Sequence, residues 1–162
     1  MKVTKDHLNY PDYYLGASHT NGFINPDSLK VYLATAAKCM KTIKVPYDTL
    51  AFAGISGAVI GPALAIKLKK ECLLVRKDCD KHCTRENVSG HEGVKSYLIV
   101  DDLIDSGRTV EMIQKKIYQF SKSAKCIGVV QVQYLEPSYT DLEVYTTKCN
   151  LTKERLVEYS SC

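Results

Sequence analysis

Three carboxylates stand close together in the chain, at Asp101, Asp102 and Asp105. The first two follow directly on the apolar run of residues 97–100, and two further apolar residues precede the third. A small polar turn comes next, and an amphipathic stretch begins after it. The order is typical of a buried strand, an acidic strand tip and a loop that opens a helix.

The polar turn consists of Ser106, Gly107, Arg108 and Thr109. Because the first turn of a helix has unpaired N–H groups and a partial positive charge, such a turn can bind a phosphate. Carboxylates beside it can accept hydrogen bonds from sugar hydroxyls and help to hold Mg²⁺. These residues could therefore bind a phosphorylated ribose.

A plainer interpretation of the same residues is a strand followed by a capped helix. Ser106 would then be the N-cap, and the three aspartates would be solvated. We favour the binding site, because crowded carboxylates repel one another unless a cation or hydroxyl groups meet them.

The segment YLIVDDLIDSGRT, residues 97–109, resembles the phosphoribosyl pyrophosphate (PRPP) signature of the type I phosphoribosyltransferases. The resemblance implies an α/β fold with a mostly parallel twisted sheet flanked by helices. It also implies a Mg²⁺-dependent enzyme that transfers the 5-phosphoribosyl group from PRPP to a nitrogenous base and releases pyrophosphate.

Within this resemblance each residue of the signature has an expected role. Asp101 and Asp102 would accept hydrogen bonds from the ribose hydroxyls and contact Mg²⁺ indirectly. Asp105 would lie near the reacting base as a catalytic general base, and residues 106–109 would bind the 5′-phosphate.

Residues Gly54, Ile55, Ser56 and Gly57 join an expected strand to an expected helix. Two glycines let the backbone approach a ligand closely. The segment could be an ordinary tight turn, but beside the signature it resembles the family's pyrophosphate-binding loop. That likeness also implies a cis peptide bond that does not involve proline.

The charged run from Arg76 to His82 resembles the catalytic loop of orotate phosphoribosyltransferases. The likeness casts Arg76 and Lys81 as catalytic and Lys77 as PRPP-binding. Lys81 stands one residue after the position of the family's lysine, where this chain has Asp80. The alternative is a solvated charge run.

The acceptor base is expected to contact the N-terminal segment of residues 19–25, which loosely resembles the substrate segment of the orotate enzymes. Phe23 and His19 are the candidate base-binding residues. An orotate-like pyrimidine is favoured, and a purine base is possible, since residues from 134 onward could form a base-covering hood.

Apolar spacing predicts alternating strands and helices. Helices are expected over 28–43, after an Asp27 cap, and over 58–70 and 107–121; strands are expected over 48–53, 72–76, 97–100, 127–135 and 142–145. Residues 77–94 are expected to form a mobile catalytic loop with hinges at Ser89, Gly90 and Gly93. Alternation of this kind favours a doubly wound sheet with ligands at the carboxyl ends of its strands.

The composition is that of one globular domain spanning residues 1–162, with 45% hydrophobic and 25% charged residues and a net charge of +4. The charge suits anionic small substrates, and no basic stripe indicates nucleic-acid binding. The sequence has no signal-peptide pattern and no apolar run long enough for a membrane span. A cytoplasmic protein is therefore expected.

The seven cysteines are expected to be free thiols. A zinc site formed by Cys79, His82, Cys83 and His91 is an alternative, weakened because the Cys-x-x-x-Cys spacing lacks a second close pair.

Two other functions stay open beside the transferase. One is a PRPP-binding regulator without catalysis, which the cations at 76, 77 and 81 disfavour. The other is a different nucleotide-binding domain, which the lack of a Walker-type loop or a G-x-G-x-x-G motif disfavours. The resemblance further implies a homodimer.

Overall fold

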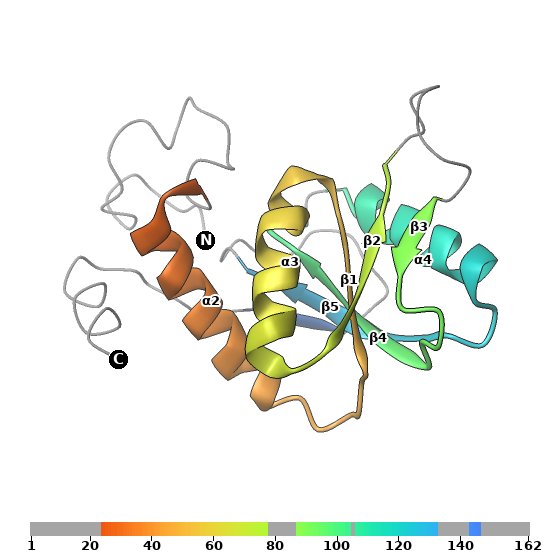
Figure 1. Ribbon diagram of the computed structural model, residues 1–162, viewed down its shortest axis with the longest axis horizontal. Coiled ribbons are helices and arrows are strands. Elements are labelled where there is room, and N and C mark those ends of the chain that lie inside the picture. The colour runs from red at the N-terminus through yellow and green to blue at the C-terminus, as the bar shows by residue number, and fades with distance from the viewer. Residues whose placement is uncertain (1–23, 78–86, 105, 133–142, 147–162) are drawn as a thin grey trace.

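The computed structural model describes residues 24–77, 87–104, 106–132 and 143–146, which form a twisted sheet flanked by helices (Figure 1). The strands lie in the order β3-β2-β1-β4-β5-β6. Every neighbouring pair is parallel except β2 and β3. The strands are β1 (Thr49–Ala53), β2 (Glu71–Val75), β3 (Val88–Gly90), β4 (Ser96–Asp101), β5 (Lys125–Gln131) and β6 (Val144–Thr146). The expected mostly parallel α/β fold is confirmed.

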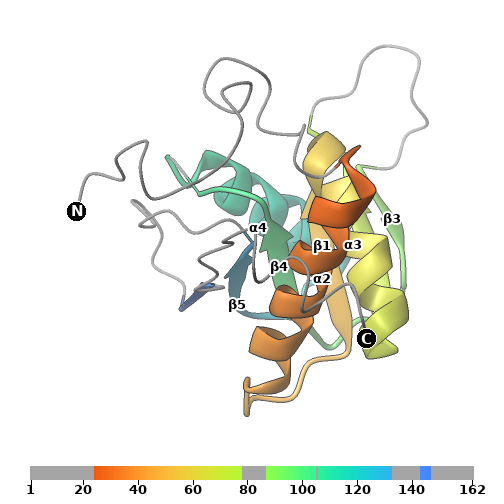
Figure 2. The ribbon, with the colours of Figure 1, turned by 90° about the vertical axis from the view of Figure 1, so that its left-hand side faces the viewer.

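Helices cover both faces of the sheet. Helices α2 (Pro26–Lys41) and α3 (Gly54–Leu68) lie on one face, and α4 (Arg108–Phe120) lies on the other (Figures 1 and 2). Alternate residues of each central strand serve the two layers: Leu98 packs with α2 and α3, whereas Ile99 packs with α4. Burial on both faces explains why these strands are continuous apolar runs in the sequence.

Close packing of α3 on the sheet depends on Gly61. A Cβ at this position would overlap the ring of Phe52, which lies in β1. A larger residue would therefore push the helix away from the strand whose carboxyl end leads into it.

The element boundaries differ from expectation at two helix starts. Helix α2 begins at Pro26, and its cap is Asn25, not Asp27: the Asn25 Oδ1 accepts hydrogen bonds from the N–H groups of Asp27 and Ser28 at 3.0 and 3.3 Å. Helix α3 begins at Gly54, so residues 54–57 are its first turn and not a separate loop.

The expected loop over residues 77–94 is wrong in part, because it contains strand β3. Gly90, proposed as a hinge with Ser89, lies in this strand at a φ of +134° and packs against the Cys72 carbonyl. The His91 N–H donates a 3.0 Å hydrogen bond to that carbonyl. Pairing with β2 thus holds the two proposed hinge residues, Ser89 and Gly90, in place.

Among the described residues, Cys39, Cys72 and Cys126 are thiols outside any disulfide bond, as expected. Within the same residues no helix is both long enough and apolar enough to cross a membrane.

Candidate active site

The parallel strands bring distant residues to one edge of the sheet. Ala53, at the end of β1, pairs in register with Val75 at the end of β2, and Asp101, at the end of β4, pairs with Gln131 of β5. Strands β1 and β4 are neighbours. The segments beginning at Gly54, Arg76 and Asp102 therefore leave the sheet at the same edge, where ligands bind in folds of this kind.

A buried carboxylate pair lies at the centre of this edge. The side chains of Asp101 and Asp102 are only 7% and 5% exposed. The Ser56 hydroxyl, in the first turn of α3, donates a 3.0 Å hydrogen bond to Asp102 Oδ1. The Asp102 N–H donates to Asp101 Oδ1 at 3.1 Å. The pair is thus tied to the start of α3.

Burial, followed by the neighbouring charge of Asp102, raises the pKa of Asp101 to about 7. Near neutral pH the Asp101 carboxyl is therefore protonated for part of the time. A ligand that donates hydrogen bonds, or a nearby cation, would favour the ionised form. The pair is suited to accept hydroxyl groups of a polyol.

Two helices begin beside this pair without a side-chain cap. The N-cap residues of α3 and α4 are Ala53 and Gly107, and no side chain of the described residues accepts a hydrogen bond from either first turn. Ser106 is exposed and is not the cap, so the plainer interpretation of the signature is wrong on this point. Both helices can therefore offer free N–H groups to an anion.

Backbone reversals at glycine create these two helix starts. Gly54 and Gly107 have φ angles of +70° and +73°, values that glycine adopts without the steric cost of a Cβ. The expected cis peptide bond is wrong for this region, because all peptide bonds among the described residues are trans.

The Lys77 side chain extends over the first turn of α3. A Cβ placed on Gly54 would lie 3.0 Å from Lys77 Cε and 3.3 Å from its Nζ. The positive charge of Lys77 partly offsets the upward shift in the pKa of Asp101. Arg76, next to it, is half-buried, and its Nε makes no hydrogen bond to any described residue. Both residues lie where the sequence analysis expected cations.

Lys116 of α4 holds the backbone that carries these cations. Its Nζ donates hydrogen bonds to the carbonyls of Arg76 and Lys77 at 2.6 and 2.5 Å. The Arg76 N–H donates in turn to the Asn87 carbonyl at 3.0 Å, across the base of the β2–β3 connection. The sequence analysis missed Lys116, because only tertiary packing places it at the end of β2.

Gln131 is a second residue that the sequence analysis missed. Its side chain is fully buried, and it pairs in register with Asp101. The Val132 N–H donates to the Asp101 carbonyl at 3.0 Å. A polar residue directly after the apolar run of residues 126–130 was the signal that could have drawn attention to it.

The remaining signature residues line the start of α4. Gly107 is buried, Thr109 is half-buried and Arg108 is exposed. Ile55, by contrast, is 74% exposed, so only its backbone can serve the first turn of α3. The other candidates, His19, Phe23, Lys81 and Asp105, lie outside the described residues.

The described part of the chain contains no group of three His, Cys, Asp or Glu side chains that could hold a metal. Of the zinc candidates only His91 is described, and Cys79, His82 and Cys83 lie outside. The hard oxygen atoms of Asp101 and Asp102 suit Mg²⁺ better than zinc. Their burial fits contact through water or ribose hydroxyls.

Comparison with known proteins reveals the fold but no close relative. No family model and no curated protein matches the sequence. Orotate phosphoribosyltransferase from Aeropyrum pernix has a similar structure, with a TM-score of 0.61 and 13% identity over 85% of this chain and 78% of that one. The orotate phosphoribosyltransferase of Francisella tularensis gives 0.58 and 19% over 85% of this chain.

An adenine enzyme is also similar. Adenine phosphoribosyltransferase from Saccharomyces cerevisiae gives a TM-score of 0.55 and 21% identity over 77% of this chain and 81% of that one. The chain spans 65% of the Francisella protein and 30% of a similar UMP synthase from Leishmania donovani. The chain therefore has the type I phosphoribosyltransferase fold, the fold of both orotate and adenine phosphoribosyltransferases.

Proposed function

We propose that the protein is a phosphoribosyltransferase that joins PRPP to a ring nitrogen of a nucleobase and releases pyrophosphate. One observation carries the proposal: a buried carboxylate pair lies at the carboxyl edge of the sheet, where two helices begin whose N-cap residues, Ala53 and Gly107, make no side-chain cap within the described part of the chain. PRPP has the matching groups, with a diol between a 5′-phosphate and a pyrophosphate.

Each group of PRPP has a counterpart in this arrangement. The first turn of α4, with Ser106 and Thr109, would bind the 5′-phosphate. The Asp101 and Asp102 carboxylates would accept the ribose hydroxyls. The first turn of α3, from Gly54 to Gly57, would bind the pyrophosphate with its N–H groups.

The reaction exchanges one bond at the anomeric carbon of the ribose. The base nitrogen forms a bond to that carbon, and the carbon–oxygen bond to pyrophosphate breaks with its electron pair. Asp105 would take the proton that the base nitrogen loses. Because negative charge grows on the leaving group, Lys77, Arg76 and the α3 N–H groups would stabilise the transition state more than the ground state.

Lys81 is the candidate for a further cation on the leaving group. At ~4 Å and an effective dielectric constant of ~20, one such charge is worth about 4 kcal/mol before desolvation. When bound, Mg²⁺ would supply positive charge that offsets the negative charge of the pyrophosphate. Asp101 and Asp102 are the residues that would hold it through water or the diol.

The acceptor is proposed to be an orotate-like pyrimidine, with His19 and Phe23 as base-binding residues and a purine base as the alternative. The similar structures include both orotate and adenine enzymes, so they support the reaction type without favouring one base. A cytoplasmic homodimer acting in nucleotide biosynthesis or salvage is part of the same proposal.

A PRPP-binding regulator without catalysis is the second candidate. Exposed Ser106 and Arg108 and the buried carboxylates would serve binding equally well in such a protein. The position of Lys77 over the first turn of α3 favours the enzyme, because a cation at the leaving group contributes to bond cleavage.

The test is a panel assay with PRPP and Mg²⁺ against orotate, adenine, hypoxanthine, guanine, xanthine and uracil, following pyrophosphate release. Turnover with one base identifies the enzyme and its acceptor. Calorimetric binding of PRPP without turnover on any base would favour the regulator. Absence of both would exclude the two candidates together.

A further inference from the structure

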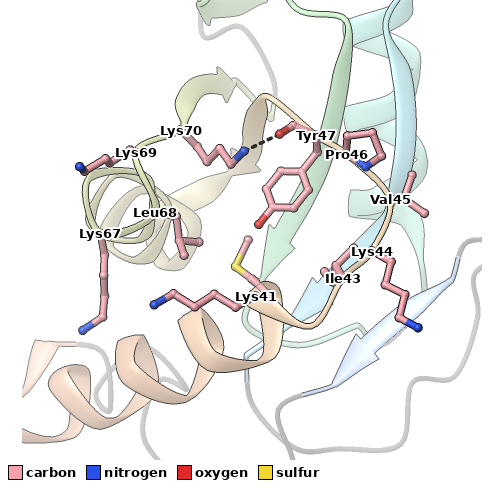
Figure 3. A pocket seen from close by; sticks show the side chains of 11 residues that line it. Lys41, Ile43, Lys44, Val45, Pro46, Tyr47, Lys67, Leu68, Lys69 and Lys70 are labelled. Carbon is pink, nitrogen blue, oxygen red and sulfur yellow. Dashed lines mark hydrogen bonds between the residues drawn. The ribbon is translucent and has the colours of Figure 1, made fainter.

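A second concave site lies away from the carboxylates, where α2 and α3 end (Figure 3). The pocket has a volume of about 390 Å³, and its walls come from these two helix ends and from the segment that leads into β1. Helix α3 has 15 residues and begins at the carboxylate pair. At 1.5 Å per residue it separates the two sites by about 20 Å.

The pocket is strongly cationic. Five lysines line it, and no acidic residue does; the lysines are Lys41, Lys44, Lys67, Lys69 and Lys70. Figure 3 shows the Lys41 side chain reaching from α2 and the Lys67 side chain from α3 toward the space between the two helices. Among the described residues the one ion pair is between Lys30 and Asp27, far along α2, so no acidic side chain of the described part pairs with any of the five lysines.

The negative ends of the two helix dipoles offset only part of this positive charge. The carbonyl end of a helix carries about −0.5 charge, so two helix ends together balance about one lysine. The last carbonyls are moreover already occupied: those of Cys39 and Ala65 accept hydrogen bonds from the N–H groups of Thr42 and Lys70, both at 2.9 Å. A clear excess of positive charge is left at the pocket.

The inner wall of the pocket is apolar and aromatic. Tyr47 lies in its centre, and the Leu68 side chain lies on the α3 side of it (Figure 3). Lys70 is held in place there, because its Nζ donates a 2.6 Å hydrogen bond to the Tyr47 carbonyl and lies 4.5 Å from the centre of the tyrosine ring. A ligand would therefore meet a fixed aromatic surface with cations around it.

The backbone at Lys69 adds an independent observation. Lys69 ends α3 in the left-handed conformation, at a φ of +54°, where glycine or asparagine is usually found. It is the one residue other than glycine with positive φ in the described part of the chain. A lysine in this conformation has a steric cost of about 1 kcal/mol. A glycine could end the helix without that cost, so helix capping does not explain the lysine.

We propose that this pocket binds a small phosphate-bearing anion with a planar apolar group, such as a nucleotide. The phosphates would contact Lys41, Lys67 and Lys69, and the planar group would lie against Tyr47. Aromatic rings and cations are a common means of recognising such ligands. The inference does not depend on the transferase activity proposed above.

Isothermal titration calorimetry with ATP, inorganic triphosphate and adenosine tests the proposal. The titrations use the unmodified protein, and the pocket variants below separate binding at the pocket from phosphate binding at the starts of α3 and α4. We expect ATP to bind more tightly than triphosphate, triphosphate to bind measurably, and affinity for both to fall as salt rises. No binding of either phosphate compound would overturn the proposal.

Matched charge variants locate the site. Lys41→Gln with Lys67→Gln should weaken ATP binding about tenfold. Lys30→Gln with Lys122→Gln removes the same charge outside the pocket and should change the affinity less than about twofold. Equal loss in both double variants would mean diffuse surface attraction and would contradict a site.

A third variant separates the two halves of the ligand. Tyr47→Leu should weaken ATP binding and leave triphosphate binding unchanged, because only ATP has a group to place on the ring. Thermal melts of each variant establish that it is folded. Equal effects on ATP and triphosphate in a folded Tyr47→Leu protein would contradict the proposed orientation.

Discussion

The charged groups at the two ends of the sheet differ in sign and in burial. At the carboxyl edge, Asp101 and Asp102 are buried beside uncapped helix starts. At the other end, the pocket lysines surround helix ends whose carbonyls already have partners. Buried acids need a ligand or a shared proton, whereas lysines on long side chains can stay hydrated. The comparison indicates that buried charge destabilises the carboxyl edge, whereas the charged groups of the pocket at the other end keep their hydration.

The largest effect is expected from removing both charges at the carboxyl edge. Asp101→Asn with Asp102→Asn should lower PRPP binding or turnover more than 100-fold, because the ribose hydroxyls lose both anionic acceptors. Calorimetry with PRPP and Mg²⁺ and the panel assay measure this. Retention of either function in the folded double variant would contradict the assigned role.

A single Asp→Asn substitution at each end gives the sharpest contrast in stability. The pKa of Asp101 is raised from 3.8 to about 7, so the folded protein binds a proton more tightly than the unfolded chain. This difference in proton binding adds to the free energy of unfolding in full below about pH 4, and the gain is lost as the pH rises through about 7. Asp101→Asn should therefore raise Tm at pH 8 by ~5 °C, about 2 kcal/mol, and flatten this pH dependence.

Asp48, before β1, should respond with the opposite sign. Its carboxylate accepts hydrogen bonds from Thr49 Oγ1 at 2.6 Å and from the N–H groups of Lys95 and Ser96 at 3.1 and 3.2 Å. Asp48→Asn should cost about 2 kcal/mol, because an amide cannot accept all three. Thermal melts at pH 5 and 8 compare the two variants; equal signs at pH 8 would contradict the difference between the ends.

A smaller effect is expected from Lys116. Lys116→Met removes the donor to the Arg76 and Lys77 carbonyls while keeping most of the apolar stem. We expect kcat to fall about tenfold with little change in KM, since Lys77 would be positioned less well for the leaving group. Lys115→Met, one residue earlier and exposed, is the control. An unchanged kcat for Lys116→Met would leave Lys116 with no more than a structural role.

The smallest effect is expected at Lys69. Lys69→Gly removes the steric cost of a Cβ at positive φ but gives the unfolded chain more freedom, so the two terms nearly cancel. The free energy of unfolding should change by less than about 0.5 kcal/mol, while triphosphate binding at the pocket weakens. Chemical denaturation measures the first and calorimetry the second. A loss of stability above 1 kcal/mol would mean that the lysine side chain itself stabilises the helix end.

Local patterns in the sequence predict much of this molecule. The run into Asp101 and Asp102 predicts a buried strand with an acidic tip, and the polar turn at residues 106–109 predicts a helix start. Arg76 and Lys77 follow an apolar strand in the sequence, which predicts that both cations lie at the carboxyl edge of the sheet. These features depend on neighbouring residues, and therefore the order of residue types is enough to find them.

Other features depend on pairing between distant segments. Residues 88–90 form a strand only because β2 offers them an antiparallel edge, and Asn25 caps α2 although Asp27 has an equally suitable side chain. Lys116 reaches the end of β2 because α4 packs across that strand. A pattern of neighbouring residues carries no information about which distant segments will come into contact.

The order of residue types along the chain accounts for the alternation of strands and helices and for the acids and cations at strand ends. Those properties arise from hydrophobic periodicity and turn chemistry within a few residues. The tertiary structure decided which groups meet: Ser56 with Asp102, Lys77 over Gly54, and the lysines of two helix ends around Tyr47. Side chains far apart in the chain become neighbours only when strand register and helix packing have placed their backbones.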